Sequence, residues 1–454
     1  MKTEIDEIPP LCRFFLEPNQ ISHIYFKILF FSLGSQMSGE RESCNSRHLT
    51  WLIKSCFPDP ANHTTTKLTT CSSHSKTQPH PTSPTHPTTI SSLPDDIVLN
   101  FLSRLPPSSL SSLSFVCRRW SLLLHSPHFS DLRRNLNLLR HTLLSLTATD
   151  FGFSFSTFSN SNPSLSLPYY DAVSLLSQAR VASIGPRIFI VGRNATVKYD
   201  TWTETVSPCS AMIFPRKKFA VAAVAGKIYI AGGGSRTDTV EEYDPLTNTW
   251  SVIAHAPRRR YGCIGASSDG VFYVIGGLRI GASEKNEFSS RANLGAEVYA
   301  SSMDLFEVEG RTWLKSRTVP GGGCVVAGCA AAGKVYVLTS HTVEVSFWSF
   351  DAKRKCGGGG GRDGGGAFGE WVKLESPRFL AQVRVDSRIR FSCVGMGDKV
   401  VLIQVGGRVL NEERRRGSSR EGFVLVYDCV SGEWERGDDL PEIYRRAAYV
   451  SVEC

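Results

Sequence analysis

A unit of paired glycines, an aromatic residue and a tryptophan recurs in the second half of the chain. In its clearest copy, Gly232 and Gly233 end a strand-like run, and Tyr243 then precedes Trp250 by seven residues. The order returns twice more, and the same interval separates Phe306 from Trp313 and Tyr427 from Trp434. Three agreeing copies predict a repeat architecture in which each unit is a small β-sheet that needs its neighbours to bury its core.

Two further copies are degenerate. In residues 187–206 the place of the tryptophan is taken by Val206, and residues 334–371 lack the glycine pair and reach Trp371 only after a glycine-rich insertion. The unit resembles the kelch repeat, which forms one four-stranded blade of a β-propeller. That resemblance implies a kelch-repeat propeller over residues 143–454, in which glycines adopt backbone angles denied to other residues and the aromatic residues pack between blades.

The two ends of this region are complementary. Residues 447–452 look like an innermost strand with no blade after it, and residues 143–167 look like three outer strands, with Phe158 and Leu165 at the seven-residue interval. We therefore expect six blades, the last one closed by pairing of the N-terminal and C-terminal strands of the propeller. Closure would remove the exposed sheet edges that invite aggregation.

Each glycine-ending strand is preceded by a strand of small residues, which suits the crowded centre of a propeller. The cysteines on these strands are expected to fill space, not to bind metal or react; they are Cys263, Cys324, Cys329 and Cys393. The 13 cysteines show no CxxC pair, which argues against a zinc ribbon or a disulfide framework. No cofactor is expected.

Residues 91–140 predict a small all-helical module in front of the repeats. Apolar residues recur at helical spacing, Pro106 and Pro107 end the first helix, a second is expected to run to Leu124, and a third over residues 128–140. Three such helices leave more apolar surface than they can bury among themselves, so a protein partner is expected.

Within this module the segments Leu93-Pro94-x-Asp96, Leu105-Pro106 and Val116-Cys117-Arg118-Arg119-Trp120 resemble the F-box motif. The resemblance implies binding to the Skp-type adaptor of a cullin–RING ubiquitin ligase. It assigns contact with the adaptor, or support of that contact, to Leu93, Pro94, Ile97, Leu105, Pro106, Val116, Cys117 and Trp120.

The first 90 residues predict a disordered tail, because their second half is dominated by serine, threonine, histidine and proline. Whether the chain starts at Met1 or Met37 stays open. No run approaches the roughly 18 apolar residues of a membrane span, and the first residues are acidic, unlike a signal peptide. We expect a protein of the cytoplasm or nucleus with no membrane partner.

Basic residues gather where the chain enters an innermost strand or leaves a glycine pair, two positions that share one face of a propeller. They are Arg216, Lys217, Lys218, Arg236, Arg258, Arg259, Arg260, Arg279, Arg445 and Arg446, with residues 414–416. One interpretation is a solvated charged rim. The other is a substrate-binding face for an acidic or phosphorylated peptide. Nucleic acid is not favoured, since aromatic residues do not alternate with these charges.

No motif for a nucleophile, a phosphate-binding loop or a metal protease stands in a suitable setting. The F-box and kelch resemblances together imply a non-catalytic substrate receptor of an SCF-type ubiquitin ligase, whose helices bind the adaptor and whose propeller binds the target. The alternative is an F-box/kelch scaffold that acts outside a ligase. A kelch enzyme or cytoskeletal protein is disfavoured by the F-box-like segment.

Overall fold

The computed structural model describes residues 92–157, 165–168, 172–234, 237–279, 299–341, 344–351, 371–376, 389–405, 422–439 and 447–454. Contacts divide the chain into two units, residues 1–98 and residues 99–454, and each is considered by itself. The tail predicted to be disordered, residues 1–90, lies outside the described residues. The described part of the first unit is residues 92–98, which begin the first described helix.

Four short helices precede the first strand: α3 (Asp95–Ser103), α4 (Pro107–Ser114), α5 (Arg118–Leu124) and α6 (Pro127–Asn135). The expectation of one helix running to Leu124 was wrong, because the chain breaks into α4 and α5 around Val116. Pro107 occupies the first turn of α4, where its missing N–H costs nothing.

The third predicted helix also ends earlier than expected, at Asn135 instead of Arg140. Asn137 adopts a left-handed conformation with φ of 54°, which a helix cannot continue through. Arg140 then exchanges two backbone hydrogen bonds with Cys454, of 2.9 and 3.0 Å. The chain leaves the helix because strand pairing with the C-terminal residues satisfies its backbone groups instead.

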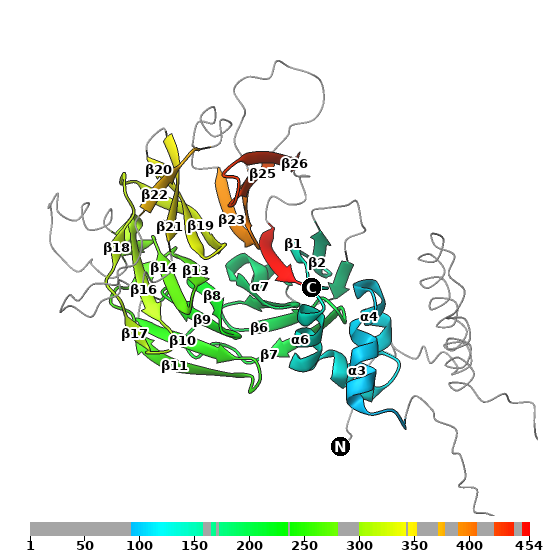
Figure 1. Cartoon of the computed structure of the whole chain (residues 1–454). Helices are drawn as coiled ribbons and strands as arrows, with labels where there is room; N and C mark the ends of the chain where they lie inside the picture. The colour runs from blue at the N-terminus through cyan, green and yellow to red at the C-terminus, as the bar shows by residue number, and fades with distance from the viewer. Residues whose placement is uncertain are drawn as a thin grey trace, which may run out of the picture. The chain divides into compact units, whose positions relative to one another are not determined.

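The strands form six antiparallel sheets around one axis (Figure 1). Blade 1 holds β4 (Arg180–Ile184), β5 (Arg187–Val191), β6 (Thr196–Asp200) and β7 (Thr205–Cys209). Blade 2 holds β8 (Ala220–Val224), β9 (Lys227–Ala231), β10 (Thr239–Asp244) and β11 (Thr249–His255). Blade 3 holds β13 (Ile264–Ser268), β14 (Val271–Ile275), β16 (Ser302–Glu307), β17 (Thr312–Trp313) and β18 (Arg317–Thr318).

Blade 4 holds β19 (Cys324–Ala331), β20 (Lys334–His341), β21 (Glu344–Asp351) and β22 (Trp371–Leu374). Blade 5 holds β23 (Arg390–Met396), β24 (Lys399–Val405), β25 (Gly422–Asp428) and β26 (Trp434–Asp439). Blade 6 holds β27 (Ala448–Glu453), β1 (His141–Thr149), β2 (Gly152–Thr157) and β3 (Leu165–Pro168). A two-stranded ribbon joins β12 (Arg260–Tyr261) to β15 (Leu278–Arg279), and α7 (Ala172–Gln178) connects blade 6 to blade 1.

The predicted six-bladed propeller is therefore confirmed, including its closure. The C-terminal strand β27 pairs with β1 from His141 opposite Glu453 to Leu146 opposite Ala448. The innermost strands touch in the order β27, β4, β8, β13, β19, β23 and back to β27. In blade 6, Leu165 lies opposite Phe155; Phe158, which precedes Leu165 by seven residues, lies outside the described residues.

The aromatic residue and the tryptophan of each repeat lie directly opposite each other on the third and fourth strands. Tyr243 faces Trp250 with ring centroids 4.9 Å apart, and the equivalent pairs of blades 3, 4 and 5 lie 5.0–5.1 Å apart. The indole of Trp250 also donates a hydrogen bond of 2.8 Å to the carbonyl of Ser210, which follows the last strand of blade 1. The indoles of Trp313 and Trp434 make the same kind of bond, to the carbonyls of His255 and Glu375, so the tryptophan ties blades 2, 3 and 5 to the blade before them.

Close backbone packing explains the small residues of the innermost strands. A Cβ on Gly265 would lie 2.2 Å from the carbonyl oxygen of Val221 in the neighbouring blade. Cys263 and Cys329 are buried there, and burial raises the pKa of both thiols, as expected for space-filling residues. The same expectation was wrong for Cys324, which is exposed at the start of β19.

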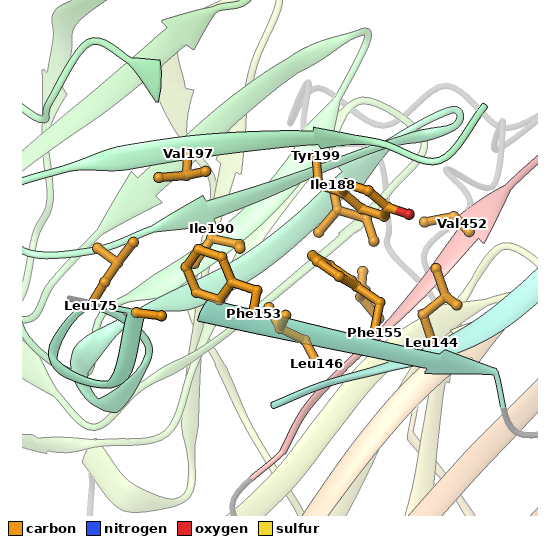
Figure 2. Packing of buried hydrophobic residues seen from close by; sticks show 12 residues of the cluster. Leu144, Leu146, Phe153, Phe155, Leu175, Ile188, Ile190, Val197, Tyr199 and Val452 are labelled. Carbon is orange, nitrogen blue, oxygen red and sulfur yellow. The ribbon is translucent and has the colours of Figure 1, made fainter. Parts of the chain in front are cut away.

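Blades 6 and 1 share a hydrophobic core that includes the closing strand (Figure 2). Phe155 stacks on Tyr199 with ring centroids 3.9 Å apart, and Val452 is buried in the same cluster. Leu175 of α7 packs so closely that a Cβ on Gly192 would meet it at 2.1 Å. The terminal strand is thus part of the core.

Deleting residues 448–454 should destabilise the whole propeller. The deletion removes the pairing of β1 and the burial of Val450 and Val452, which together contribute about 3 kcal/mol or more. Thermal unfolding followed by circular dichroism should show a clearly lower Tm, and a synthetic peptide of residues 447–454 should restore part of the loss. An unchanged Tm after the deletion would mean that β27 does not close the ring.

Candidate functional site

The residues assigned to adaptor contact divide into exposed and half-buried positions. Pro94 and Ile97 at the start of α3 are exposed and Leu93 is half-buried. In the second unit, Pro106, Val116 and Cys117 are exposed, whereas Leu105 and Trp120 are half-buried. The half-buried residues suit support of a contact surface, and the exposed residues suit the contact itself.

Sequence reasoning missed the most exposed apolar residues of this region. Phe115 is 68% exposed and Leu122 is 63% exposed, while Val116 beside Phe115 is 47% exposed. Phe115 and Val116 lie at the break between α4 and α5, so neither helix covers them. Because the second helix was expected to be continuous, Phe115 was not recognised as exposed. Side chains of this size on the surface of a small helical module indicate a binding surface.

A tryptophan from blade 1 anchors the helices to the propeller. Trp202, in the turn between β6 and β7, is 1% exposed. Its ring meets Phe129 of α6 edge-on with centroids 5.1 Å apart, and the guanidinium of Arg133 lies 5.5 Å from its ring centroid. Burial of this indole between an aromatic ring and a cation stabilises the contact between α6 and blade 1.

Arg133 itself is buried and tied to the helical module. Its Nη1 donates to the carbonyl oxygens of Ser103 and Leu105 at 3.2 and 2.8 Å. Burial lowers the pKa of this guanidinium below the usual arginine value. The buried charge is tolerated because carbonyl dipoles and the π-face of Trp202 surround it. Arg133 thereby joins the end of α3, the helix α6 and blade 1.

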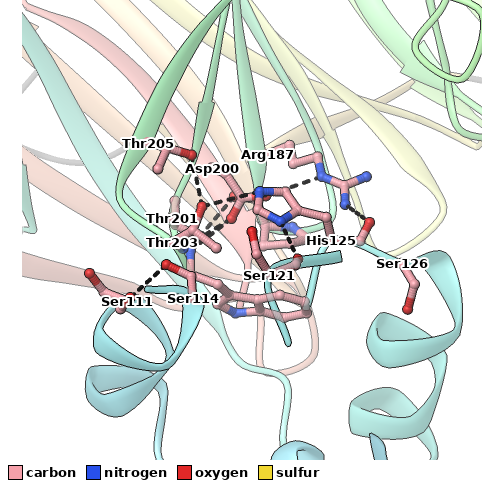
Figure 3. Close-up of polar contacts among 12 residues, drawn as sticks. Ser111, Ser114, Ser121, His125, Ser126, Arg187, Asp200, Thr201, Thr203 and Thr205 are labelled. Atoms are coloured by element: carbon pink, nitrogen blue, oxygen red, sulfur yellow. Dashed lines mark hydrogen bonds and ion pairs between the residues drawn. The ribbon is translucent and has the colours of Figure 1, made fainter. Parts of the chain in front are cut away.

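Polar contacts surround the anchor (Figure 3). Arg187 of β5 donates to the backbone carbonyl of His125 and to the Asp200 carboxylate, the latter at 3.3 Å. The His125 ring lies 4.0 Å from the same carboxylate and 3.4 Å from the Thr203 hydroxyl. These contacts hold the segment between α5 and α6 against two hairpins of blade 1.

The turn that carries Trp202 recurs in other blades without a partner helix. The Asp200 carboxylate accepts a hydrogen bond of 3.0 Å from the Trp202 N–H, and Asp244 and Asp428 make the same bond to Leu246 and Val430. Leu246 is 80% exposed and Val430 is 82% exposed, whereas Trp202 is buried. A large aromatic residue two positions after the turn aspartate is thus the sequence signal that could have revealed the anchor.

Two of the arginines predicted for a basic rim are structural. Arg216 is buried and bonds to Glu241 at 2.7 Å, and Arg260 is buried and bonds to Asp304 at 2.8 Å. Both occupy the same position, four residues before an innermost strand, and their acids lie two residues before the repeat aromatic. Arg258 adds a second ion pair of 2.7 Å to Asp304.

The other predicted rim residues that the structure describes are exposed. Lys217, Lys218 and Arg259 lie on loops that connect one blade to the next, and Arg279 lies in β15, after the second strand of blade 3. Arg236, Arg445, Arg446 and residues 414–416 lie outside the described residues. Arg259 lies 4.0 Å from the Asp238 carboxylate. The predicted rim is therefore partly a set of internal ion pairs and partly an exposed cationic surface.

Comparison with known proteins agrees with this architecture. The family model described as F-box-like matches residues 90–130, and the Kelch motif model matches residues 215–256. An F-box/kelch-repeat protein of Arabidopsis thaliana is 52% identical over 430 residues, which cover 91% of this chain and 99% of the relative.

The chain belongs to the F-box/kelch-repeat proteins. A second F-box/kelch-repeat protein of the same plant is 30% identical over 205 residues, 41% of this chain and 54% of that relative. The solved structure titled "Structure of YjhT" aligns with a TM-score of 0.40 and 18% identity over 58% of this chain and 84% of its own.

The F-box helices and kelch propeller offer surfaces for proteins, and the described residues contain no group of metal-ligating side chains. No helix in the described part of the chain is long and apolar enough to cross a membrane.

Replacing Trp202 by alanine should loosen the F-box helices from the kelch propeller. Truncation of a fully buried tryptophan costs about 3–5 kcal/mol, and here it also leaves Arg133 without the ring that covers it. Limited proteolysis should therefore cleave between α6 and β1 faster, and the Tm should fall. Leu246→Ala, in the equivalent turn of blade 2, is the matched control and should change neither. Equal protease resistance of Trp202→Ala and the native chain would contradict the anchoring role.

Proposed function

We propose that this F-box/kelch-repeat protein is the substrate receptor of an SCF-type cullin–RING ubiquitin ligase. Its F-box helices bind a Skp-type adaptor, and its kelch propeller binds the target protein. The chain itself contributes proximity and no bond-making chemistry, because transfer of ubiquitin takes place on the partner subunits. Such a ligase acts in the cytoplasm or the nucleus.

The observation that carries this proposal is the exposed apolar surface of the F-box helices. Phe115 and Val116 are uncovered at a break inside the segment that matches the F-box-like model, next to the exposed Cys117 and the half-buried Trp120. A protein surface of this kind gains stability when a partner removes it from water.

The opposite end of the propeller supports the target-binding half of the proposal. Within blades 1 to 5, the connections from the first strand to the second and from the third to the fourth lie at one end of the sheet, which we call the hairpin end. Loops lie at the other end, the loop end. The F-box helices contact blade 1 through Arg187 and Trp202 at the hairpin end. Among the described residues, the loop end carries exposed basic side chains that suit an acidic or phosphorylated segment of the target.

Replacing Val116 by aspartate should weaken adaptor binding strongly without unfolding the protein. Val116 is 47% exposed, so a charge there costs little in the free chain but would be desolvated at the adaptor surface. Isothermal titration of the full chain with a Skp-type adaptor should show at least about a tenfold weaker Kd, since one unpaired charge costs several kcal/mol at an interface. Val430→Asp, at a propeller valine that is 82% exposed, is the control for the introduced charge and should bind normally.

Reconstitution with adaptor, cullin and RING subunit then separates the two candidate functions. A ligase receptor assembles all four subunits and becomes ubiquitinated itself when a ubiquitin-conjugating enzyme is added. A scaffold that acts outside a ligase would bind the adaptor but fail to join the cullin. Binding that Val116→Asp leaves unchanged would refute the adaptor surface named here.

A further inference from the structure

Exposed cationic and apolar side chains meet at the loop end of blades 2 and 3. We call this surface the cationic patch, and it consists of Lys217, Lys218, Tyr261, Leu278 and Arg279. Lys217, Lys218 and Arg279 are exposed, Leu278 is 54% exposed and Tyr261 is half-buried. The ammonium group of Lys218 lies 5.6 Å from the Tyr261 ring centroid, and Tyr261 lies opposite Leu278 in the β12–β15 ribbon.

The backbone holds this patch in a fixed and strained form. Lys218 has a φ of 52°, a left-handed conformation that few non-glycine residues adopt. The N–H of Lys217 donates to Gly233 at 3.0 Å, and the N–H of Gly262 donates to Lys218 at 2.9 Å. A Cβ on Gly233 would lie 2.6 Å from the Lys217 carbonyl oxygen, so the glycine pair permits the approach. Strain kept in place by neighbouring contacts is typical of binding surfaces.

Three carboxylates near these loops, among the residues that the structure describes, already have partners. Glu241 is paired with buried Arg216, and Asp304 is paired with Arg258 and Arg260. Asp238 accepts a hydrogen bond of 2.9 Å from the His255 ring, and this bond lowers the Asp238 pKa; the same carboxylate lies 4.0 Å from the Arg259 guanidinium. The acids therefore stabilise the loops beneath the surface and leave the charges of Lys217, Lys218 and Arg279 for a ligand.

The patch lies at the end of the propeller opposite the one that contacts the F-box helices. It follows the glycine pair of blade 3 and precedes the first strands of blades 2 and 3, which places it at the loop end. The F-box helices occupy the hairpin end at blade 1. A protein bound at the patch is thus separated from the helices by the length of a blade.

We propose that the cationic patch binds an acidic, unphosphorylated peptide segment of the target, with carboxylates flanking one large apolar side chain. The two lysines and Arg279 pair with the carboxylates, and Tyr261 with Leu278 receives the apolar residue. Lysine ammonium groups are flexible point charges, which suits carboxylates spaced along an extended chain. This inference rests on the proposed substrate-receptor function in one respect, namely that the peptide belongs to a target protein. Binding of the peptide to the patch does not require that a ligase assembles.

The test is fluorescence anisotropy with the full chain bound to its adaptor and a labelled peptide of alternating glutamate and glycine around one central leucine. We expect saturable binding that weakens as salt rises, and loss of binding when every glutamate is replaced by glutamine. Lys218→Glu should weaken the Kd by about fivefold or more, because an exposed attraction becomes a repulsion. Leu278→Ala should weaken it as well, at every salt concentration.

Lys315→Glu, which makes the same charge change at an exposed residue between β17 and β18, is the matched control and should leave the Kd unchanged. Equal effects of Lys218→Glu and Lys315→Glu, or no saturable binding, would overturn the patch. Tighter binding of a phosphoserine version of the peptide, or of a single-stranded oligonucleotide of equal charge, would overturn the choice of ligand. If the peptide fails to bind while the reconstituted ligase is active, the inference about the patch is wrong and the receptor function stands. If the peptide binds while the reconstituted ligase is inactive, only the receptor function is refuted.

Discussion

The pairing of β27 with β1 is the constraint on which the rest of the structure depends. Every other blade is built from one continuous stretch of sequence, but blade 6 takes its innermost strand from the far end of the chain. Without that strand, β1 would present an unpaired edge, and Val450 and Val452 would leave the core that Phe155 and Tyr199 share. Because closure brings Cys454 beside Arg140, it also fixes where the helices leave the propeller.

The repeat chemistry made this fold readable from the sequence, since it is local and periodic. The interval from Tyr243 to Trp250 reflects two strands joined by a short turn, which place both rings opposite each other. Closure could be predicted because residues 447–452 look like an innermost strand that no further strands follow in the sequence. The helix boundaries were harder to predict. The chain after α6 pairs with the C-terminal residues through the bond from Arg140 to Cys454, a tertiary contact that local sequence does not reveal.

The candidate surfaces were predictable only in part, for an electrostatic reason. A run of arginines before an innermost strand shows that positive charge is concentrated there. It does not show which of these side chains is buried in an ion pair. Arg216 and Lys217 are neighbours in the sequence, yet the first is buried on Glu241 and the second is exposed. The choice depends on acids brought in from the third strand of each blade, at positions that the repeat pattern did not mark. The Trp202 anchor was not predicted either, because the residues at the equivalent turn position of blades 2 and 5, Leu246 and Val430, are exposed.

The anchor has a geometric consequence for a receptor. Trp202, Arg133 and the His125 segment fix α4 to α6 on the hairpin end of blade 1, whereas the cationic patch lies at the loop end of blades 2 and 3. A peptide held at the patch would therefore stand at one set distance and direction from the exposed Phe115 and Val116. A flexible link would let any lysine of a target reach the transfer site, but a fixed one restricts transfer to lysines within a limited zone. In a receptor of the proposed kind, the buried tryptophan would therefore influence which target lysines are modified, as well as the stability of the fold.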